Sequence, residues 1–572
     1  MTAPRSRATF VAVILLTASV GCGDRDAPGP PGGGDAAVES GGTAVITETA
    51  DINHPLSLLF MSSVDGNLAA DVMNMELLRG EWRDGQLAYM TADESPMALA
   101  RRFEYIGADS TALRFHMRSD VLWSDGTPLT AHDVAFTYEL AASEALSSPR
   151  MDYVEHIDSV VANNDSVVTF HFGRRHANML THTTIAPIPR HIYEGTDPAQ
   201  LRTHPSMTSP AGNLVVSGPF MIGHHERGQR IVLVRNPHFQ PAAHLDEIVV
   251  RIIPDATTRL VELQTGAVDF VQNVSFDQIP RLREQAPQIR WEREEKRTYD
   301  YIAYNPTGFE PFADPDIRRA LSMAIDTRAL IDGLQMEEFA VPAGGPYSPI
   351  LSDLYAENET PPVAFAPDEA RRILASKGWT DVNRDGILQR NGQRFRFTLL
   401  TNAGNQRRAD ATQIIQQQWR QIGVDVQLRA LEFNTFMAAI TGDDYQAALG
   451  GWVVNLSPDL TQMWAADSPY NITRYRNPEV SRLFGQALAQ PTQEAATPLW
   501  RQAAATLARD QPYTWLYYFD SVDAVNERLR GVKVDSYGPY QNTWEWWIPS
   551  DRRRGGAASA GRAAPQTESP EN

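Results

Sequence analysis

Two short motifs in the sequence carry residue types that could bind a metal ion. Residues 381–386 read Asp-Val-Asn-Arg-Asp-Gly, which opens like an oxygen-rich calcium loop. Position twelve of that loop is Gly392, where a bidentate glutamate is required, so a hairpin turn is the favoured interpretation. His224 and His225 are adjacent, and neighbouring residues of a strand point to opposite faces, which makes them poor joint ligands. We therefore predict no metal centre and no cofactor.

Catalytic signatures are missing from the sequence. It contains no phosphate-binding glycine loop, no Gly-x-Gly-x-x-Gly, no HExxH and no Ser-His-Asp arrangement that can be recognised. Aspartate and glutamate total 70 residues, but nothing singles out a general acid and base for hydrolysis. The net charge of −19 argues against nucleic acid, because phosphate binding needs a basic face. We expect a protein that is not an enzyme and binds no nucleic acid.

The first 22 residues predict export. Two arginines precede an apolar run at 8–20 and then a small residue and Cys22, which is the order of a secretory signal. Cys22 is the only cysteine, so no internal disulfide can form. A cysteine directly after the apolar run resembles the lipid-attachment box of bacterial lipoproteins, although Ser19 stands where that box usually has Leu or Val. We expect a lipid-anchored protein in the periplasm or at the cell surface; the alternative is a plain cleaved signal.

Strand and helix signals alternate along the body of the chain and predict an α/β fold. Residues 113–117 alternate apolar and polar as a strand does, and Thr130 with Asp133 forms a capping box before a helix. Caps and apolar spacing predict three further helices, at 314–324, 367–377 and 494–509. A strand is expected at 513–519. The Gly- and Pro-rich stretch 23–42 and the tail 550–572 have little to bury and are expected to be unstructured.

Seven collinear stretches resemble the family 5 solute-binding proteins, the peptide/nickel group of ABC importers. The longest, 113–140, reads LRFHMRSDVLWSDGTPLTAHDVAFTYEL and resembles the signature segment of that family. The others follow in the family's order at 186–191, 216–220 with 235–237, 253–269, 316–326, 367–379 and 451–452. One such match is weak evidence, whereas seven in order over nearly the whole body are strong evidence.

The resemblance implies a periplasmic-binding-protein-like clamshell with an inserted domain and two crossing hinge strands. Lobe I is predicted to be discontinuous and to comprise 43–81, 206–296 and 511–549. The inserted domain II is predicted at 82–205 and lobe III at 297–510. The crossing strands are expected near 298–305 and 514–519, which are aromatic and β-prone. In this family, ligand stabilises the closed state, which the transporter recognises.

The resemblance also places the ligand segment at Gly451, Trp452 and Val453. Peptide-binding relatives carry an aspartate three residues after the Gly-Trp pair, and its carboxylate grips the peptide ammonium. Asn455 stands there in this chain, and an amide offers no full charge. Asp459 lies four residues further on and could take that role after a loop rearrangement, or simply begin a helix. Trp452 suits a sugar face or a peptide side chain equally well, or it is a core residue.

The crossing strand contributes three further candidates, Tyr301, Tyr304 and Asn305, with a structural role as the alternative for the tyrosines. We expect a monomeric receptor that captures peptides or similar oligomeric solutes and delivers them to ABC permease and ATPase subunits. Because Asn455 breaks the peptide pattern, the same fold could instead take an oligosaccharide, a metal chelate or a signalling compound. A secreted hydrolase built on the clamshell is the third hypothesis.

Overall fold

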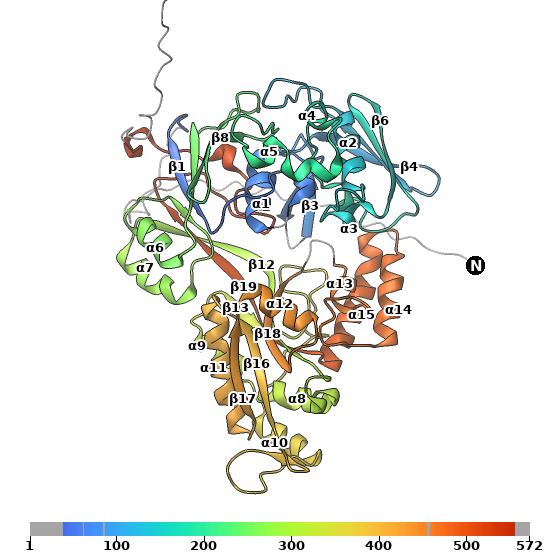
Figure 1. Ribbon diagram of the computed structural model, residues 1–572, viewed down its shortest axis with the longest axis vertical. Coiled ribbons are helices and arrows are strands. Elements are labelled where there is room, and N and C mark those ends of the chain that lie inside the picture. The colour runs from blue at the N-terminus through green and yellow to red at the C-terminus, as the bar shows by residue number, and fades with distance from the viewer. Residues whose placement is uncertain (1–37, 61, 84–85, 455–457, 555–572) are drawn as a thin grey trace, which may run out of the picture. The chain divides into compact units, whose positions relative to one another are not determined.

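One mixed sheet runs through the fold and carries two long strands at its centre. The computed structural model describes residues 38–60, 62–83, 86–454 and 458–554 (Figure 1). Within these ranges an eleven-stranded sheet has the order β17 (Asp425–Leu431), β16 (Arg396–Asn402), β18 (Ala447–Val453), β12 (Ile289–Tyr304), β19 (Tyr513–Asn526), β11 (Phe270–Val271), β1 (Thr43–Glu48), β10 (Glu247–Ile252), β9 (Arg230–Arg235) and β8 (Phe220–Glu226), with β13 (Ala340–Pro342) against β19.

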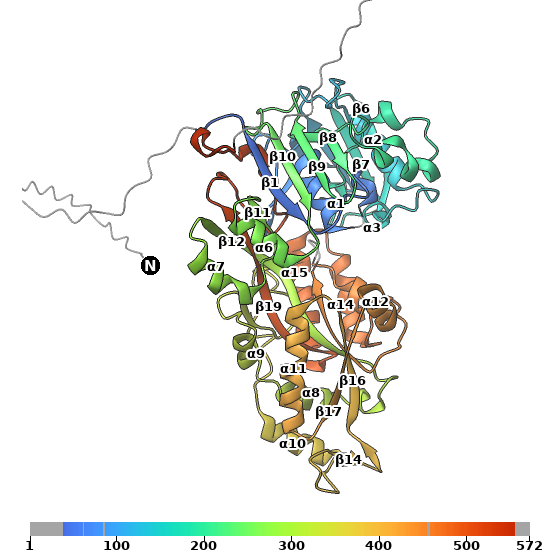
Figure 2. The same cartoon turned by 60° about the vertical axis from the view of Figure 1, so that its left-hand side comes forward.

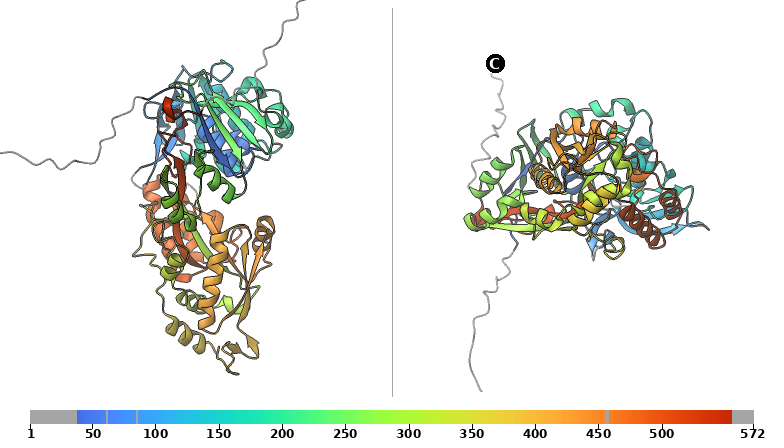
Figure 3. Two further views of the ribbon diagram at one scale, coloured as in Figure 1. Left: turned by 90° about the vertical axis from the view of Figure 1, so that its left-hand side faces the viewer. Right: turned by 90° about the horizontal axis from the view of Figure 1, so that it is seen from below.

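The two predicted crossing strands are the central pair β12 and β19. They pair antiparallel from Ile289 opposite Asn526 to Ala303 opposite Tyr513, with the ladder interrupted between Glu294 and Thr298. Their 16 and 14 residues reach from the neighbourhood of β11 and β1 to that of β18 (Figures 2 and 3). The second half of β12, from Thr298, and the whole of β19 are rich in aromatic and β-branched residues and are largely buried, as suits a strand covered on both faces.

Alternate side chains of the central strands pack into two different cores. Tyr299, Tyr301 and Ala303 face one core, whereas Ile302 and Tyr304 face the other, because neighbouring residues of a strand point to opposite faces. The first core contains residues of α12 (Phe433–Thr441), α13 (Thr461–Trp464), α14 (Pro478–Leu488) and α15 (Gln493–Asp510). The second contains residues of α8 (Pro315–Met323), α9 (Thr327–Gly333), α10 (Pro367–Ser376) and α11 (Gln406–Gln421).

A separate four-stranded sheet holds the signature segment. Its order is β4 (Ala100–Ile106), β5 (Ala112–Met117), β7 (Val167–Phe172) and β6 (Ile157–Asn164). Helix α2 (Ala131–Ala141) packs on it, with the ring of Tyr138 4.8 Å from that of Phe170. The predicted strand at 113–117 is confirmed, and so is the capping box, in which the Asp133 carboxylate accepts the Thr130 N–H at 2.8 Å.

The remaining described elements are short. The helices are α1 (Ser63–Leu68), α3 (Met151–Val154), α4 (Arg190–Tyr193), α5 (Pro205–Thr208), α6 (Ala256–Gln264) and α7 (Ile279–Gln285). Two small hairpins pair β2 (Arg79–Arg83) with β3 (Gln86–Met90), and β14 (Gln389–Arg390) with β15 (Gln393–Arg394). Among the residues described, no helix has both the length and the apolar character that crossing a membrane demands.

Helix predictions made from caps and apolar spacing are confirmed. Helix α8 begins after Asp314, whose side chain accepts the Asp316 N–H, and its first residue is a proline. The predicted helices at 367–377 and 494–509 are α10 and α15, and the predicted strand at 513–519 is the first half of β19. Local signals sufficed here because a cap and an apolar stripe act within one turn or one face of the element.

Four predicted segment boundaries lie within or beside described elements and contacts. The lobe I to domain II boundary at 81–82 falls inside β2, and the boundary at 296–297 falls inside β12. Within the predicted linker 23–42, the Gly41 N–H donates to the His244 carbonyl at 2.7 Å. Within the predicted tail 550–572, Arg554 forms an ion pair of 2.9 Å with the buried Asp269. These contacts are long-range, so sequence composition could not reveal them.

Candidate ligand-binding site

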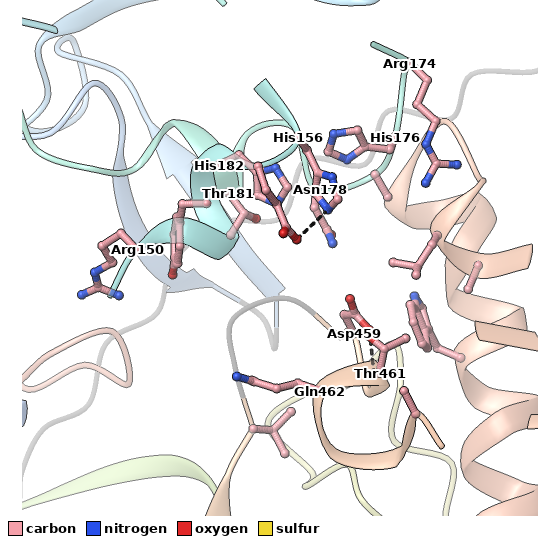
Figure 4. Close-up of a pocket in the computed structure, with 18 of the residues that line it drawn as sticks. Arg150, His156, Arg174, His176, Asn178, Thr181, His182, Asp459, Thr461 and Gln462 are labelled. Atoms are coloured by element: carbon pink, nitrogen blue, oxygen red, sulfur yellow. Dashed lines mark hydrogen bonds and ion pairs between the residues drawn. The ribbon is translucent and has the colours of Figure 1, made fainter. Parts of the chain in front are cut away.

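A cavity of about 1010 Å³ lies between the small sheet and the helices that follow β18 (Figure 4). One wall comes from 150–182 together with Arg297 of β12, and the facing wall comes from 453–454 and 459–488 together with Trp500. The lining side chains include Arg150, Tyr153, Glu155, His156, Asp158, Arg174, His176, Asn178, Thr181, His182, Val453, Val454, Asp459, Thr461, Gln462 and Leu488. This volume lies at the upper end of the roughly 300–1,000 Å³ typical of ligand pockets.

Three imidazoles form a cluster on the first wall. The ring of His182 lies 5.3 Å from that of His156 and 5.1 Å from that of His176. Burial, helped by the neighbouring imidazoles, lowers the pKa of His176 to about 4 and that of His182 to about 3. Both rings are therefore neutral at physiological pH. His176 Nε2 and His182 Nδ1 are buried and have no hydrogen-bond partner among the described residues, and both residues line the cavity.

Asp459 and the start of α13 form the facing wall. In Figure 4, Asp459, Thr461 and Gln462 lie across the cavity from His156, His176 and His182. The Asp459 carboxylate accepts the Thr461 N–H at 2.8 Å, although the N-cap residue of α13 is Leu460. Asp459 therefore lies just before this helix, and it also lines the cavity.

The predicted ligand segment is only partly at the cavity. Val453 lines it and is 59% exposed. Trp452 instead stacks against Tyr301 at 6.2 Å and donates from its indole N–H to the Tyr513 hydroxyl at 3.4 Å. Gly451 lies opposite Asp300 of β12, inside the sheet. Asn455 falls outside the described residues.

The three candidates on the crossing strand are buried in the cores and do not line this cavity. Tyr301 stacks on Tyr513 with a centroid distance of 4.1 Å. The Tyr304 hydroxyl lies 2.7 Å from Thr514 Oγ1 on the opposite face. Asn305 donates from its amide to the Tyr445 carbonyl at 2.8 Å. Their strand positions point them into packed interiors, so the structural alternative describes them better.

The side chains of the two motifs that could suggest a metal make contacts within the chain. The Asp381 carboxylate accepts the Gly386 N–H at 2.9 Å, and Asp385 pairs with Arg394 at 2.6 Å, so the hairpin-turn interpretation is confirmed. His224 is exposed as expected, but His225 is nearly buried and lies 2.8 Å from the Asp51 carboxylate. Within the described ranges, no three His, Cys, Asp or Glu side chains converge so that they could hold a metal ion.

Sequence reasoning missed the arginines and histidines of the first wall. Arg150 and Arg297 are far apart in the chain, and His156, His176 and His182 share no helical or strand period. Only the pairing of β12 in the central sheet and the fold of the small sheet bring these side chains to one cavity. The one available signal is that 150–182 holds four of the 13 histidines, including His171.

The fold and the cavity together define a class, the periplasmic-binding-protein-like proteins, in which a mixed α/β scaffold encloses a solute. The chain belongs to the bacterial extracellular solute-binding proteins, family 5, because the sequence model of the middle region of that family matches residues 96–474. The resemblance deduced from the seven collinear stretches is therefore confirmed.

Known proteins of similar sequence and structure cover most of the chain. The oligopeptide-binding protein AppA of Bacillus subtilis is 29% identical over 443 residues, which are 76% of this chain and 80% of AppA. The structure of AppA from Bacillus subtilis in complex with a nonapeptide has a TM-score of 0.74 at 26% identity and covers 90% of this chain and 100% of its own. The ABC transporter substrate-binding protein CtaP of Listeria monocytogenes has a TM-score of 0.76 at 21% identity, covering 89% and 100%.

Proposed function

We propose that this chain is the extracytoplasmic substrate-binding lipoprotein of an ABC importer and captures peptides or similar oligomeric solutes. The observation that carries the proposal is the cavity of about 1010 Å³, whose two walls come from segments far apart in the sequence. Support comes from AppA, which covers most of this chain and whose structure holds a nonapeptide. The family of this chain consists of extracellular solute-binding proteins.

Capture is proposed to work by closure of the walls on the solute. Most of the first wall belongs to the proposed domain II with its four-stranded sheet, whereas Arg297 and the facing wall belong to the proposed lobe III, which holds β16 to β18. β12 and β19 connect the regions, and their ladder is interrupted at 295–297, where the strands can bend most easily. A solute that contacts both walls binds the closed state better and shifts the population toward it.

Peptide binding can be tested directly on the full-length mature protein. Pools of peptides of three to nine residues are expected to raise the thermal unfolding temperature, since a ligand at 100 times its Kd adds about 2.7 kcal/mol. Calorimetry then gives the stoichiometry. Stabilisation by an oligosaccharide or a metal chelate but by no peptide would assign the cavity to another solute class. Release of peptide fragments over hours would favour the hydrolase hypothesis instead.

The lipid anchor is proposed on Cys22, which lies outside the described residues. Intact mass spectrometry of the protein purified from membranes should find a diacylglyceryl-type mass addition on a mature N-terminus that begins at this cysteine. The matched variant Cys22→Ser should appear in the soluble fraction. An unmodified N-terminus downstream of Cys22 in the parent protein would refute the anchor and leave the solute-binding proposal intact.

A further inference from the structure

Arg297 lies on the cavity wall, where Glu294 and Asp535 attract its charge only from beyond ion-pair distance. Its Nε and Nη1 atoms are buried and have no hydrogen-bond partner among the described residues. Its Nη2 atom donates only a long bond of 3.4 Å, to the Ser536 carbonyl. The neighbouring carboxylate of Glu294 is instead held by Lys296 in a short ion pair. The described part of the chain therefore offers this guanidinium no carboxylate at ion-pair distance.

The position of Arg297 in the sheet explains why it points where it does. It follows the break in the β12–β19 ladder between Glu294 and Thr298, and such irregularities re-aim side chains. Its guanidinium lies over the ring of Trp82, 5.5 Å from the centroid. Burial lowers the pKa of Arg297 to about 10, which leaves it charged at neutral pH. A desolvated cation without a partner is costly, so a bound anion would stabilise this arrangement.

The surroundings of Arg297 favour an anion. Tyr153 interacts electrostatically with Arg297, and its ring lies 5.4 Å from the guanidinium of Arg150, which also lines the cavity. The neutral ring of His182 lies 6.4 Å from the same tyrosine and adds no negative charge. Of the carboxylates on this wall, Glu155 pairs with His156 at 3.4 Å.

Asp158 is exposed, so water screens its carboxylate. Asp459 lies on the facing wall instead. The cavity therefore has a cationic side, and none of the carboxylates that line it pairs directly with Arg297.

We propose that Arg297 is a specificity-determining residue that binds a carboxylate of the captured peptide, with Arg150 adding to the positive field. This inference rests on the proposed function, because it names the chemical group through which the solute is selected. A carboxylate accepts strong charge-assisted hydrogen bonds from a guanidinium, and Arg297 makes only the long bond to the Ser536 carbonyl among the described residues. The carboxylate can come from the peptide C-terminus or from an acidic side chain, and the two sources are separable by experiment.

The test compares three peptide pools of three to nine residues on the full-length protein by calorimetry. The first pool contains Ala, Gly, Ser and Leu with free C-termini, the second is the same pool amidated, and the third is amidated with one glutamate per peptide. We expect the parent protein to prefer the first or the third pool over the second by about 30-fold or more, which corresponds to about 2 kcal/mol for a lost buried charge contact. Preference for the first pool would show that Arg297 binds the carboxylate of the peptide C-terminus. Preference for the third pool would show that it binds the carboxylate of an acidic side chain.

Variants connect the preference to Arg297. Arg297→Gln should remove the discrimination while the amidated pool binds as before, and Arg297→Lys should keep a reduced discrimination because the charge remains. The matched control is Arg293→Gln on the same strand, an exposed arginine that pairs with Asp520 and does not line the cavity; it should keep the full preference.

Equal binding of all three pools to the parent protein would overturn this inference and leave the proposed function standing. An unchanged preference in Arg297→Gln would overturn it too. Failure of every pool to bind would refute the proposed function together with the inference.

Discussion

Gly451 occupies a position where the structure leaves no room for a methyl group. It lies in β18 opposite Asp300 of β12. A Cβ atom there would meet Arg408 Nη2 and Asp300 Oδ1 well inside van der Waals contact, and the Tyr299 carbonyl oxygen at 3.0 Å. Asp300 is fully buried and is held by ion pairs with Arg407 and Arg408. Gly451→Ala therefore has to displace a buried ion-pair cluster.

The expected cost follows from two contributions. Forcing a methyl group into a packed interior costs about 1–3 kcal/mol. Breaking a buried ion pair completely costs about 3–5 kcal/mol, and a displaced arginine loses part of that. We expect Gly451→Ala to lower the free energy of unfolding by about 2–4 kcal/mol. Equilibrium urea unfolding followed by circular dichroism measures this change, with the region around β18 expected to unfold first.

Gly485 provides a control, because the same glycine-to-alanine substitution there should change the free energy of unfolding in the opposite direction. It lies inside α14, and a Cβ atom there would meet nothing within 4 Å. Alanine is preferred over glycine in a helix interior by about 1 kcal/mol, so Gly485→Ala should raise the free energy of unfolding by about 0.5–1 kcal/mol. A neutral Gly451→Ala beside a stabilising Gly485→Ala would show that the Asp300 cluster yields freely, and would refute the reasoning.

Two further predictions concern a buried carboxyl and the ligand segment. Burial, with the nearby Glu294, raises the pKa of Asp523, so its contribution to stability is present at low pH and is lost as the pH rises through that raised pKa. Asp523→Asn should thus be more stable than the parent at pH 8 in urea unfolding, and the gain should shrink toward pH 4; a gain independent of pH contradicts this. Asn455→Asp should improve calorimetric binding of free-amine peptides by about tenfold through a charge-assisted contact, and no change in affinity argues against that placement.

Local physical signals explain which elements could be predicted. The capping box at Thr130 and Asp133 and the cap at Asp314 act over three residues, so the sequence displays them in full. The aromatic and β-branched stretches 298–305 and 513–519 predicted strands, and these are the adjoining parts of β12 and β19. Segment boundaries were less predictable, because the ends of the folded body are set by contacts such as that between Arg554 and Asp269.

The candidate site was predicted less well than the fold. Asp459 and Val453 were identified through the family segment and do line the cavity. Tyr304 and Asn305 were chosen for their strand, but the side of the strand that faces a core depends on what packs there, and both are buried. The side chain of Arg297 was passed over because a single arginine in a β-prone stretch looks like an ordinary surface charge.

By itself, the sequence determined the α/β class and membership of a solute-binding family, because these depend on local composition and collinear motifs. Only the tertiary structure decided which side chains share a cavity. Arg297 reaches it because β12 pairs with β19 and its ladder breaks at that residue, while the histidines reach it from the small sheet. Arg297 is distinguished by a buried guanidinium that has no ion-pair partner among the described residues. Packing creates this property, because in an extended chain water solvates every charged side chain.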